Sequence, residues 1–146
     1  MATYNGMAEG GAWLDEQVDS VLAQVGVEVR LVVSDDASSD GTRSHLEERA
    51  AADPRITVLP QRDGPPGVTG NFLHLFTTHP FDGSFVAFTD QDDVWHEDKL
   101  ATQLALMAAT GADVVSSNVT SFESLPGGGV GEKRKQLTPF FLPNVA

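Results

Sequence analysis

The sequence predicts an α/β protein in which a mostly parallel sheet is flanked by helices. Two observations support this expectation. Short apolar, β-branched segments alternate with amphipathic segments of helical spacing, which is the pattern of βαβ units. Polar residues also cluster at the ends of three expected strands, over residues 3–5, 35–36 and 90–93. Because ligands of parallel sheets bind beyond the carboxyl ends of the strands, these clusters indicate one binding edge.

The first strand is expected over residues 1–4 and ends at Asn5-Gly6, a turn-forming pair. Apolar residues then recur at helical spacing over 14–25, and Gly26 is the expected helix stop. Residues 27–34 are apolar and β-branched, which predicts a buried strand.

A second helix is expected from the next polar turn to about residue 52, with Ser39 or Asp40 as its N-cap. Residues 61–67 contain two prolines and two glycines and predict a loop. Residues 123–135 are glycine-rich and polar and are expected to be mobile. The other expected elements are a strand over 56–59, a helix over 72–79, a strand over 84–88, a helix over 100–110 and a strand over 112–119.

Composition and charge exclude several classes of function. None of the 146 residues is cysteine, which excludes disulfides, thiolate zinc sites and cysteine nucleophiles. The formal net charge of −12 argues against nucleic acid as a partner, and a phosphorylated ligand then needs a bound cation such as Mg²⁺ or Mn²⁺. No apolar run approaches the roughly 18 residues that span a membrane, and the first residues show no signal-peptide pattern.

The strongest local motif is the acidic run over residues 89–95, TDQDDVW. It follows an expected strand, where carboxylates at i and i+2 can converge on one cation if the backbone turns. Hard oxygen ligands suit Mg²⁺ or Mn²⁺, and a metal held by Asp90 and Asp92 could bridge two phosphates. The alternative is a solvated acidic turn with Asp93 near a helix start. Trp95 and the preceding strand favour the metal site.

Asp35 and Asp36 end another expected strand and are candidates for ligand contacts. A carboxylate at this place can accept hydrogen bonds from a base N–H or from ribose hydroxyls. The alternative is a helix-capping turn, which explains residues 38–40 without any ligand.

Two more segments are candidates. Residues 2–5 run from a strand into Asn-Gly, where backbone N–H groups could meet a nucleotide and Tyr4 could stack on its base. An ordinary strand-to-helix turn is the alternative. The loop over 64–72, which contains Asn71, allows close backbone approach, but it lacks the spacing and the lysine of a P-loop.

These segments, taken in order, resemble the family 2 glycosyltransferases, and bacterial rhamnosyltransferase-like members in particular. The resemblance covers roughly residues 1–120 and depends on several segments rather than on one motif. The matching segments read ATYNG, LDEQVDSVLAQ, LVVSDDASSDGT, ADPRITVL, GNFLHLF and FVAFTDQDDVWHEDKL.

The resemblance implies a Rossmann-like GT-A fold, with an incomplete C-terminal half, that binds a nucleoside-diphosphate sugar. It implies that Asp36, with Asp35 beside it, contacts the nucleotide base. Asp92 is implied as the principal metal ligand, with Asp90 as the second acid and Mg²⁺ or Mn²⁺ as the cofactor. The expected donor contacts are Ala2, Thr3, Tyr4, Asn5, Asp35, Asp36, Asn71, Asp90 and Gln91.

The implied reaction is inverting transfer of a sugar to a hydroxyl of a glycan or lipid-linked acceptor, as in polysaccharide synthesis. A dTDP- or UDP-sugar is the expected donor, and the cytoplasm, with peripheral membrane association, is the expected location. Residues 1–122 would form the donor part, and 123–146 a glycine-rich polar segment and the start of the acceptor half. The family's general base lies further downstream than this sequence reaches, and several residues are missing before ATYNG. We therefore expect a chain shortened at both ends, with no catalytic base of its own.

Three other classes remain as alternatives. A non-catalytic nucleotide-sugar-binding fragment would have the same donor-binding residues and would differ only in that it transfers no sugar. A receiver-type signalling domain also gathers aspartates at strand ends, but it needs a lysine on a neighbouring strand end. The first lysine here, Lys99, falls in a helical stretch. A nucleotidyltransferase of similar fold needs a glycine-rich signature with a lysine near the start, which this sequence lacks.

Overall fold

The computed structural model describes residues 1–8, 11–83, 85–125, 129–133 and 141–142. By its contacts the chain divides into two compact units, Met1–Asp98 and Lys99–Ala146. Each unit is considered by itself. The functional boundary expected after residue 122 is a different kind of division and stays a prediction.

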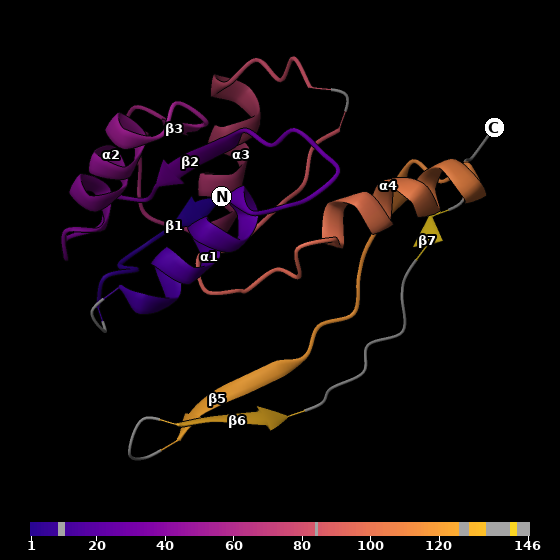
Figure 1. Cartoon of the computed structure of the whole chain (residues 1–146). Coiled ribbons are helices and arrows are strands. Elements are labelled where there is room, and N and C mark those ends of the chain that lie inside the picture. Colours follow the sequence, from indigo (N-terminus) through magenta and orange to yellow (C-terminus); the bar gives the residue numbers. More distant parts are fainter. Residues whose placement is uncertain (9–10, 84, 126–128, 134–140, 143–146) are drawn as a thin grey trace. The chain divides into compact units, whose positions relative to one another are not determined.

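The first unit contains a parallel sheet, as the sequence predicts. Its strands are β1 (Ala2–Thr3), β2 (Leu31–Asp35) and β3 (Ile56–Val58), in the order β1-β2-β3 (Figure 1). Thr3 pairs with Asp35, so the carboxyl ends of β1 and β2 lie level with each other. This register is what places the first two polar clusters at one edge.

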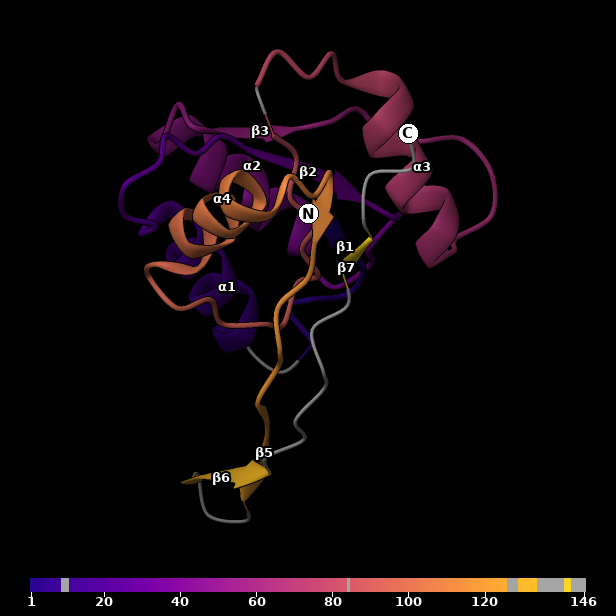
Figure 2. The same ribbon diagram turned by 90° about the vertical axis from the view of Figure 1, so that its right-hand side faces the viewer.

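Helices cover both faces of this sheet. Helices α1 (Ala12–Leu22) and α2 (Thr42–Ala52) lie on one face, and α3 (Val68–Thr78) covers β1 and β2 on the other (Figure 2). Asp15 of α1 links the first two helices, because its Oδ1 lies 2.8 Å from Nε2 of His45 and 2.7 Å from Nη1 of Arg49. No helix in the described part of the chain is long and apolar enough to cross a lipid bilayer.

The core of the unit is formed by buried faces of α1, α2, α3 and the strands, and it includes a cluster of Ala2, Leu59 and Leu75. Val33 and Leu46 have no exposed surface, and the helical spacing that predicts α1 corresponds to its buried face. The buried apolar side chains are Met1, Ala2, Leu14, Val18, Val21, Leu31, Val33, Leu46, Ile56, Leu59, Leu75 and Trp95.

Truncation of Leu46 tests this core. We expect Leu46→Ala to lower the free energy of unfolding by about 3 kcal/mol, because it removes buried methyl groups and leaves a cavity. Leu73→Ala on α3 is the matched control, since Leu73 is 58% exposed. Urea denaturation followed by tryptophan fluorescence measures both. Equal losses in the two variants would contradict this assignment of the core.

The strand expected over 84–88 is the main error in the first unit. Among the described residues 85–88 there is no strand, and the segment is tied to β1 by one backbone bond, from Ala2 N to Thr89 O at 3.3 Å. The physical reason is that β1 is only two residues long and offers little backbone to pair with. Phe85 and Phe88 are consequently 60% and 55% exposed.

Other boundaries differ by a few residues. β2 begins at Leu31, although the apolar pattern starts at residue 27, and α3 begins at Val68, where glycines obscure the helical pattern. Gly41 is the residue before α2, and neither Ser39 nor Asp40 occupies the formal N-cap position.

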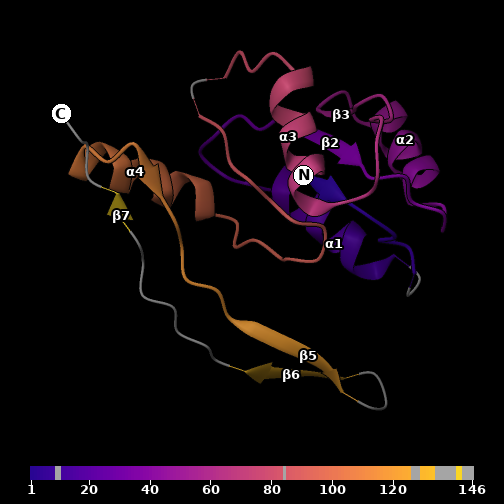
Figure 3. The same ribbon diagram turned by 180° about the vertical axis from the view of Figure 1, so that it is seen from behind.

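The second unit contains α4 (Lys99–Thr110) and two antiparallel strand pairs. β4 (Val114–Val115) pairs with β7 (Phe141–Leu142), and β5 (Ser121–Leu125) pairs with β6 (Gly129–Lys133) as a hairpin (Figure 3). The expected strand over 112–119 is thus reduced to two residues. Residues 123–125 and 129–133 of the segment expected to be mobile lie in β5 and β6, and its mobility stays a prediction. Residues 126–128 and 134–135 lie outside the described residues.

Candidate functional site

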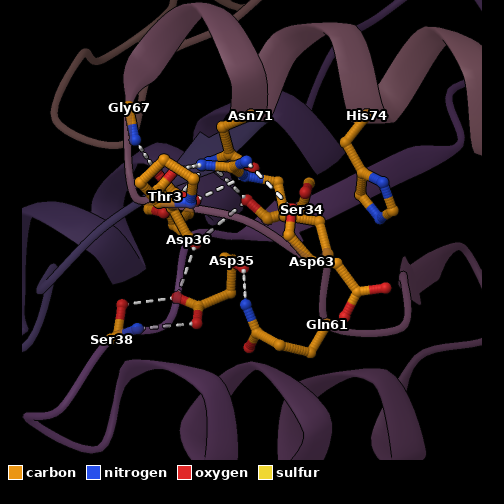
Figure 4. Close-up of polar contacts among 12 residues, drawn as sticks. Thr3, Ser34, Asp35, Asp36, Ser38, Gln61, Asp63, Gly67, Asn71 and His74 are labelled. Carbon is orange, nitrogen blue, oxygen red and sulfur yellow. Dashed lines mark hydrogen bonds and ion pairs between the residues drawn. The ribbon is translucent and has the colours of Figure 1, made fainter.

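The carboxyl ends of β1 and β2 are joined by direct side-chain contacts. Thr3 Oγ1 donates to Asp35 Oδ1 at 3.1 Å. Asn71 of α3 donates through Nδ2 to Thr3 O at 3.2 Å and to Ser34 O at 3.0 Å (Figure 4). Three residues expected from the sequence, Thr3, Asp35 and Asn71, therefore lie together at one sheet edge. Oδ1 of Asn71 is buried and has no hydrogen-bond partner among the described residues.

Asp35 anchors the turn that follows β2. It is only 1% exposed, and its carboxylate accepts from the backbone N–H of Ser38 at 3.0 Å and from the Ser38 hydroxyl. Its carbonyl accepts from Nε2 of Gln61 at 3.0 Å. Between the two acids and Ser38, Ala37 has a positive φ of 60°, which is rare for a residue with a side chain. Asp35 therefore fixes a turn whose backbone is locally strained.

Asp36 is enclosed by the loop after β3. The residue is 4% exposed, its Oδ1 accepts from Nε of Arg62 at 2.6 Å, and its Oδ2 accepts from the backbone N–H of Gly67. Burial alone would raise the pKa of Asp36, but the hydrogen bonds from Arg62 and Gly67 and the Arg62 charge outweigh it and hold the pKa below its ordinary value. A nucleotide base can therefore bind Asp36 only through the lone pairs that Arg62 and Gly67 leave open, or after Arg62 has moved away.

Arg62 is a site residue that sequence reasoning missed. Its side chain is 10% exposed, and Nη2 donates to Pro65 O, so one guanidinium holds both the loop and Asp36. The available clue was that Arg62 is the only lysine or arginine between Arg55 and Lys99. The glycines and prolines of this segment predict a loop, but they do not indicate the role of Arg62.

The turn over 38–42 supports the capping alternative in part. Asp40 accepts from the Thr42 backbone N–H at 3.0 Å and from the Thr42 hydroxyl at 2.6 Å, at the start of α2. Asn5 joins this turn, because its N–H donates to Ser38 Oγ at 2.8 Å and its Oδ1 accepts from Ser39 N at 2.9 Å. Ser38 and Asp40 thus have structural roles, and a ligand contact by Asn5 stays a prediction.

The acidic run forms an exposed turn that is held from two sides. Gln91 exchanges two hydrogen bonds with the backbone of Tyr4, at 2.8 and 3.0 Å. Thr89 accepts a hydrogen bond from Nε2 of the fully buried Gln17 on α1 and donates to Asp90 O at 3.0 Å. Because Tyr4 directly follows β1 and Gln17 lies on the next helix, the turn lies beside the first polar cluster.

Asp90 and Asp92 of this turn are both exposed, and their carboxylates are hard oxygen ligands of the kind that a divalent cation takes. Burial, and then the negative charges of Asp92 and Asp93, raise the pKa of Asp90. Within the described residues no three histidine, aspartate or glutamate side chains converge on one point. Two carboxylates are nevertheless enough for Mg²⁺, which commonly takes its other ligands from water and substrate phosphates.

These features define a class of protein. A parallel α/β sheet carries buried acids after β2, an exposed tyrosine after β1 and an exposed pair of acids beside them. Tyr4 is 51% exposed, whereas Ala2 is buried and its N–H is already bonded, so a ligand contact by Ala2 stays a prediction. The arrangement is that of a ligand-binding α/β domain with its site at the carboxyl edge of the sheet.

The chain belongs to glycosyl transferase family 2. The profile of that family matches residues 1–143. The dTDP-rhamnosyl transferase RfbG of Shigella flexneri is 33% identical over 124 residues, which cover 84% of this chain and 42% of that protein. The glucosyltransferase WfgD of Escherichia coli is 34% identical over 96 residues, which cover 64% of this chain and 35% of the relative.

A solved structure agrees with this assignment. Residues 1–349 of Staphylococcus aureus TarS, in complex with UDP, match with a TM-score of 0.56 and 26% identity, over 77% of this chain and 32% of that one. The match supports the GT-A type of fold. The chain spans less than half the length of each of these relatives.

Proposed function

We propose that this chain is the donor-binding part of a glycosyltransferase that transfers a sugar from a nucleoside-diphosphate sugar to an acceptor hydroxyl with inversion. The observation that carries the proposal is the meeting of three sequence-distant segments at one sheet edge. Thr3 is hydrogen-bonded to Asp35, and Tyr4, the residue after β1, is hydrogen-bonded to Gln91, which brings residues 35 and 91 to the end of the same short strand.

Each segment has a chemical task in this proposal. The exposed ring of Tyr4 offers a stacking surface for the base. Asp36, oriented by Arg62 and Gly67, accepts from a base N–H, and Asp35 keeps its turn in place. Asp90 and Asp92 would hold the divalent metal, which when bound supplies positive charge to the departing diphosphate.

The names of the relatives support the choice of donor and acceptor. RfbG is named for a dTDP-rhamnosyl donor, TarS was solved with UDP, and WfgD is named for a UDP-Glc donor and a diphosphoundecaprenol-linked acceptor. A dTDP- or UDP-sugar and a glycan or lipid-linked hydroxyl are accordingly the substrates we propose. Such an acceptor suits a cytoplasmic protein at the membrane surface. Cell fractionation tests the location, and recovery of the protein outside the cell would contradict it.

Calorimetric titration of the chain with dTDP and UDP, with and without Mn²⁺, tests the donor site. We expect at least one of the two to bind in the micromolar range, and about tenfold or more weakly once EDTA removes the metal. The corresponding monophosphate is the control, since it lacks the second phosphate that the cation bridges. Absence of binding by a folded sample, or identical affinity after metal removal, would reject the proposal in this form.

The second candidate function is that of a non-catalytic nucleotide-sugar-binding fragment. It is favoured by the comparisons, because the chain spans less than half the length of the transferases that it matches. A transfer assay with the same sample separates the two candidates. We propose that this chain alone binds the donor and transfers little or no sugar. Robust transfer would show that a catalytic base lies within these 146 residues.

A further inference from the structure

Both ends of the Gln91 side-chain amide are hydrogen-bonded to the backbone of one other residue, Tyr4. Its Oε1 accepts from the Tyr4 N–H at 2.8 Å, and its Nε2 donates to the Tyr4 carbonyl at 3.0 Å. A carboxamide carries a donor and an acceptor on one planar group, as a peptide unit does. Gln91 therefore pairs with Tyr4 in the way that a neighbouring strand would.

The position of this contact explains its purpose. Two residues earlier on β1, Ala2 N donates to the backbone carbonyl of Thr89 at 3.3 Å. Alternate residues of a strand bond to the same neighbour, so Tyr4 occupies the next place on this ladder. There the side chain of Gln91 takes the place of a backbone partner. The backbone at residues 90–92 can then leave the sheet edge with Asp90 and Asp92 exposed.

Gly6 gives independent support for a tight fit. A Cβ at position 6 would lie 3.2 Å from Oε1 of Gln91 and 3.4 Å from a methyl group of Leu14. The backbone at Gly6 therefore lies so close to the Gln91 amide that a side chain at position 6 would be crowded.

We propose that Gln91 is a positioning residue: its two hydrogen bonds act as a clamp that holds the backbone of Tyr4 next to the Asp90–Asp92 turn. This clamp would fix the distance between the tyrosine that stacks on the base and the acids that bind the metal. The role in ligand binding rests on the proposed function, whereas the clamp itself does not. We assign the effect of Gln91 on the ligand to Tyr4 and the turn, because both printed hydrogen bonds of its side chain run to the Tyr4 backbone.

The chain offers a direct spectroscopic test, because Tyr4 is its only tyrosine. Labelling with ¹⁵N-tyrosine and ¹³C-glutamine gives one tyrosine backbone amide resonance, whose hydrogen exchange is measured in the full chain without ligand. In the wild type we expect a protected amide and a through-hydrogen-bond scalar coupling from Tyr4 ¹⁵N to ¹³Cδ of Gln91. In Gln91→Met, which keeps the side-chain length, we expect exchange at least about fivefold faster. Affinity for the diphosphate with Mn²⁺ should fall about tenfold.

Gln103→Met is the matched control, since it makes the same chemical change on α4, in the other unit, and should alter neither readout. Unchanged Tyr4 exchange in Gln91→Met, or no scalar coupling in the wild type, overturns the clamp. The coupling decides the question even if the variant does not fold. Lower affinity with unchanged exchange makes Gln91 a ligand contact and also overturns it. If the wild type binds no diphosphate, the proposed function is rejected. If Tyr4 exchange is nevertheless faster in Gln91→Met, the clamp is supported.

Discussion

Replacing Asp92 with asparagine should weaken manganese-assisted binding of the nucleoside diphosphate by about 100-fold or more. The substitution keeps the size of the side chain but removes the charge that we assign to the principal metal ligand. Residues that only orient metal ligands already change metal affinity by about 10- to 100-fold, so loss of a ligand itself should cost at least as much. Calorimetric titration with and without Mn²⁺ measures the effect, and binding without the metal should change little.

Asp93→Asn is the matched control for this prediction. It removes the same charge one residue further along, and Asp93 also contributes to the raised pKa of Asp90. We expect a loss of less than tenfold, because Asp93 contributes only its field and not a metal bond. Equal losses in Asp92→Asn and Asp93→Asn would show that the overall negative charge of the turn matters, rather than coordination by residues 90 and 92.

Replacing Arg62 with methionine should lower the free energy of unfolding at pH 7 by about 3 kcal/mol. The side chains of Asp36 and Arg62 are 6% and 10% exposed, and removal of one partner leaves a buried charge without its counter-charge. The double variant Asp36→Asn/Arg62→Met should recover most of the loss, because no charge then remains buried. Urea denaturation of the wild type and the two variants measures this. A double variant as unstable as Arg62→Met would contradict the role of the pair.

The pH dependence of the same pair has a definite sign. In the wild type the folded pKa of Asp36 lies below its ordinary value, so its contribution to stability is complete above the ordinary aspartate pKa of about 3.9. This contribution is lost as the pH falls through the lower folded pKa. In Arg62→Met, burial raises the pKa of Asp36, and protonation relieves the buried charge. The stability difference between the two proteins should therefore shrink from pH 7 to pH 5.

The parallel sheet and its helices follow from local patterns in the sequence. The buried face of α1 has the helical spacing of Leu14, Val18 and Val21, and β2 is a β-branched run that is covered on both faces. The segment over 85–88 has an equally strong strand pattern and forms no strand. A strand needs a partner of matching length, and β1 offers two residues. The hairpin of β5 and β6 was missed because its glycine-rich composition predicts no regular structure.

The candidate site was predicted in its positions but not in its contacts. The places of Thr3 and Asp35 follow from the rule that parallel strands end at one edge. Asn71 reaches this edge from α3, and no strand precedes the acidic turn among the described residues 85–88, so the rule places neither of them. The enclosure of Asp36 by Arg62 depends on how a loop folds back over 26 residues of sequence, which no local pattern encodes. In the same way, the bidentate contact of Gln91 with Tyr4 joins residues that are 87 positions apart.

The central claim is that the ends of β1 and β2 and the Asp90–Asp92 turn form a single metal-assisted nucleotide site. A crystal structure of the chain with dTDP or UDP and Mn²⁺, with data collected at a wavelength where manganese scatters anomalously, tests it most directly. We predict one manganese peak in contact with carboxylate oxygens of residues 90 and 92 and with the diphosphate, and a base that lies against Tyr4 beside Asp36. Manganese bound by other residues, or a base placed away from β1 and β2, would contradict the account.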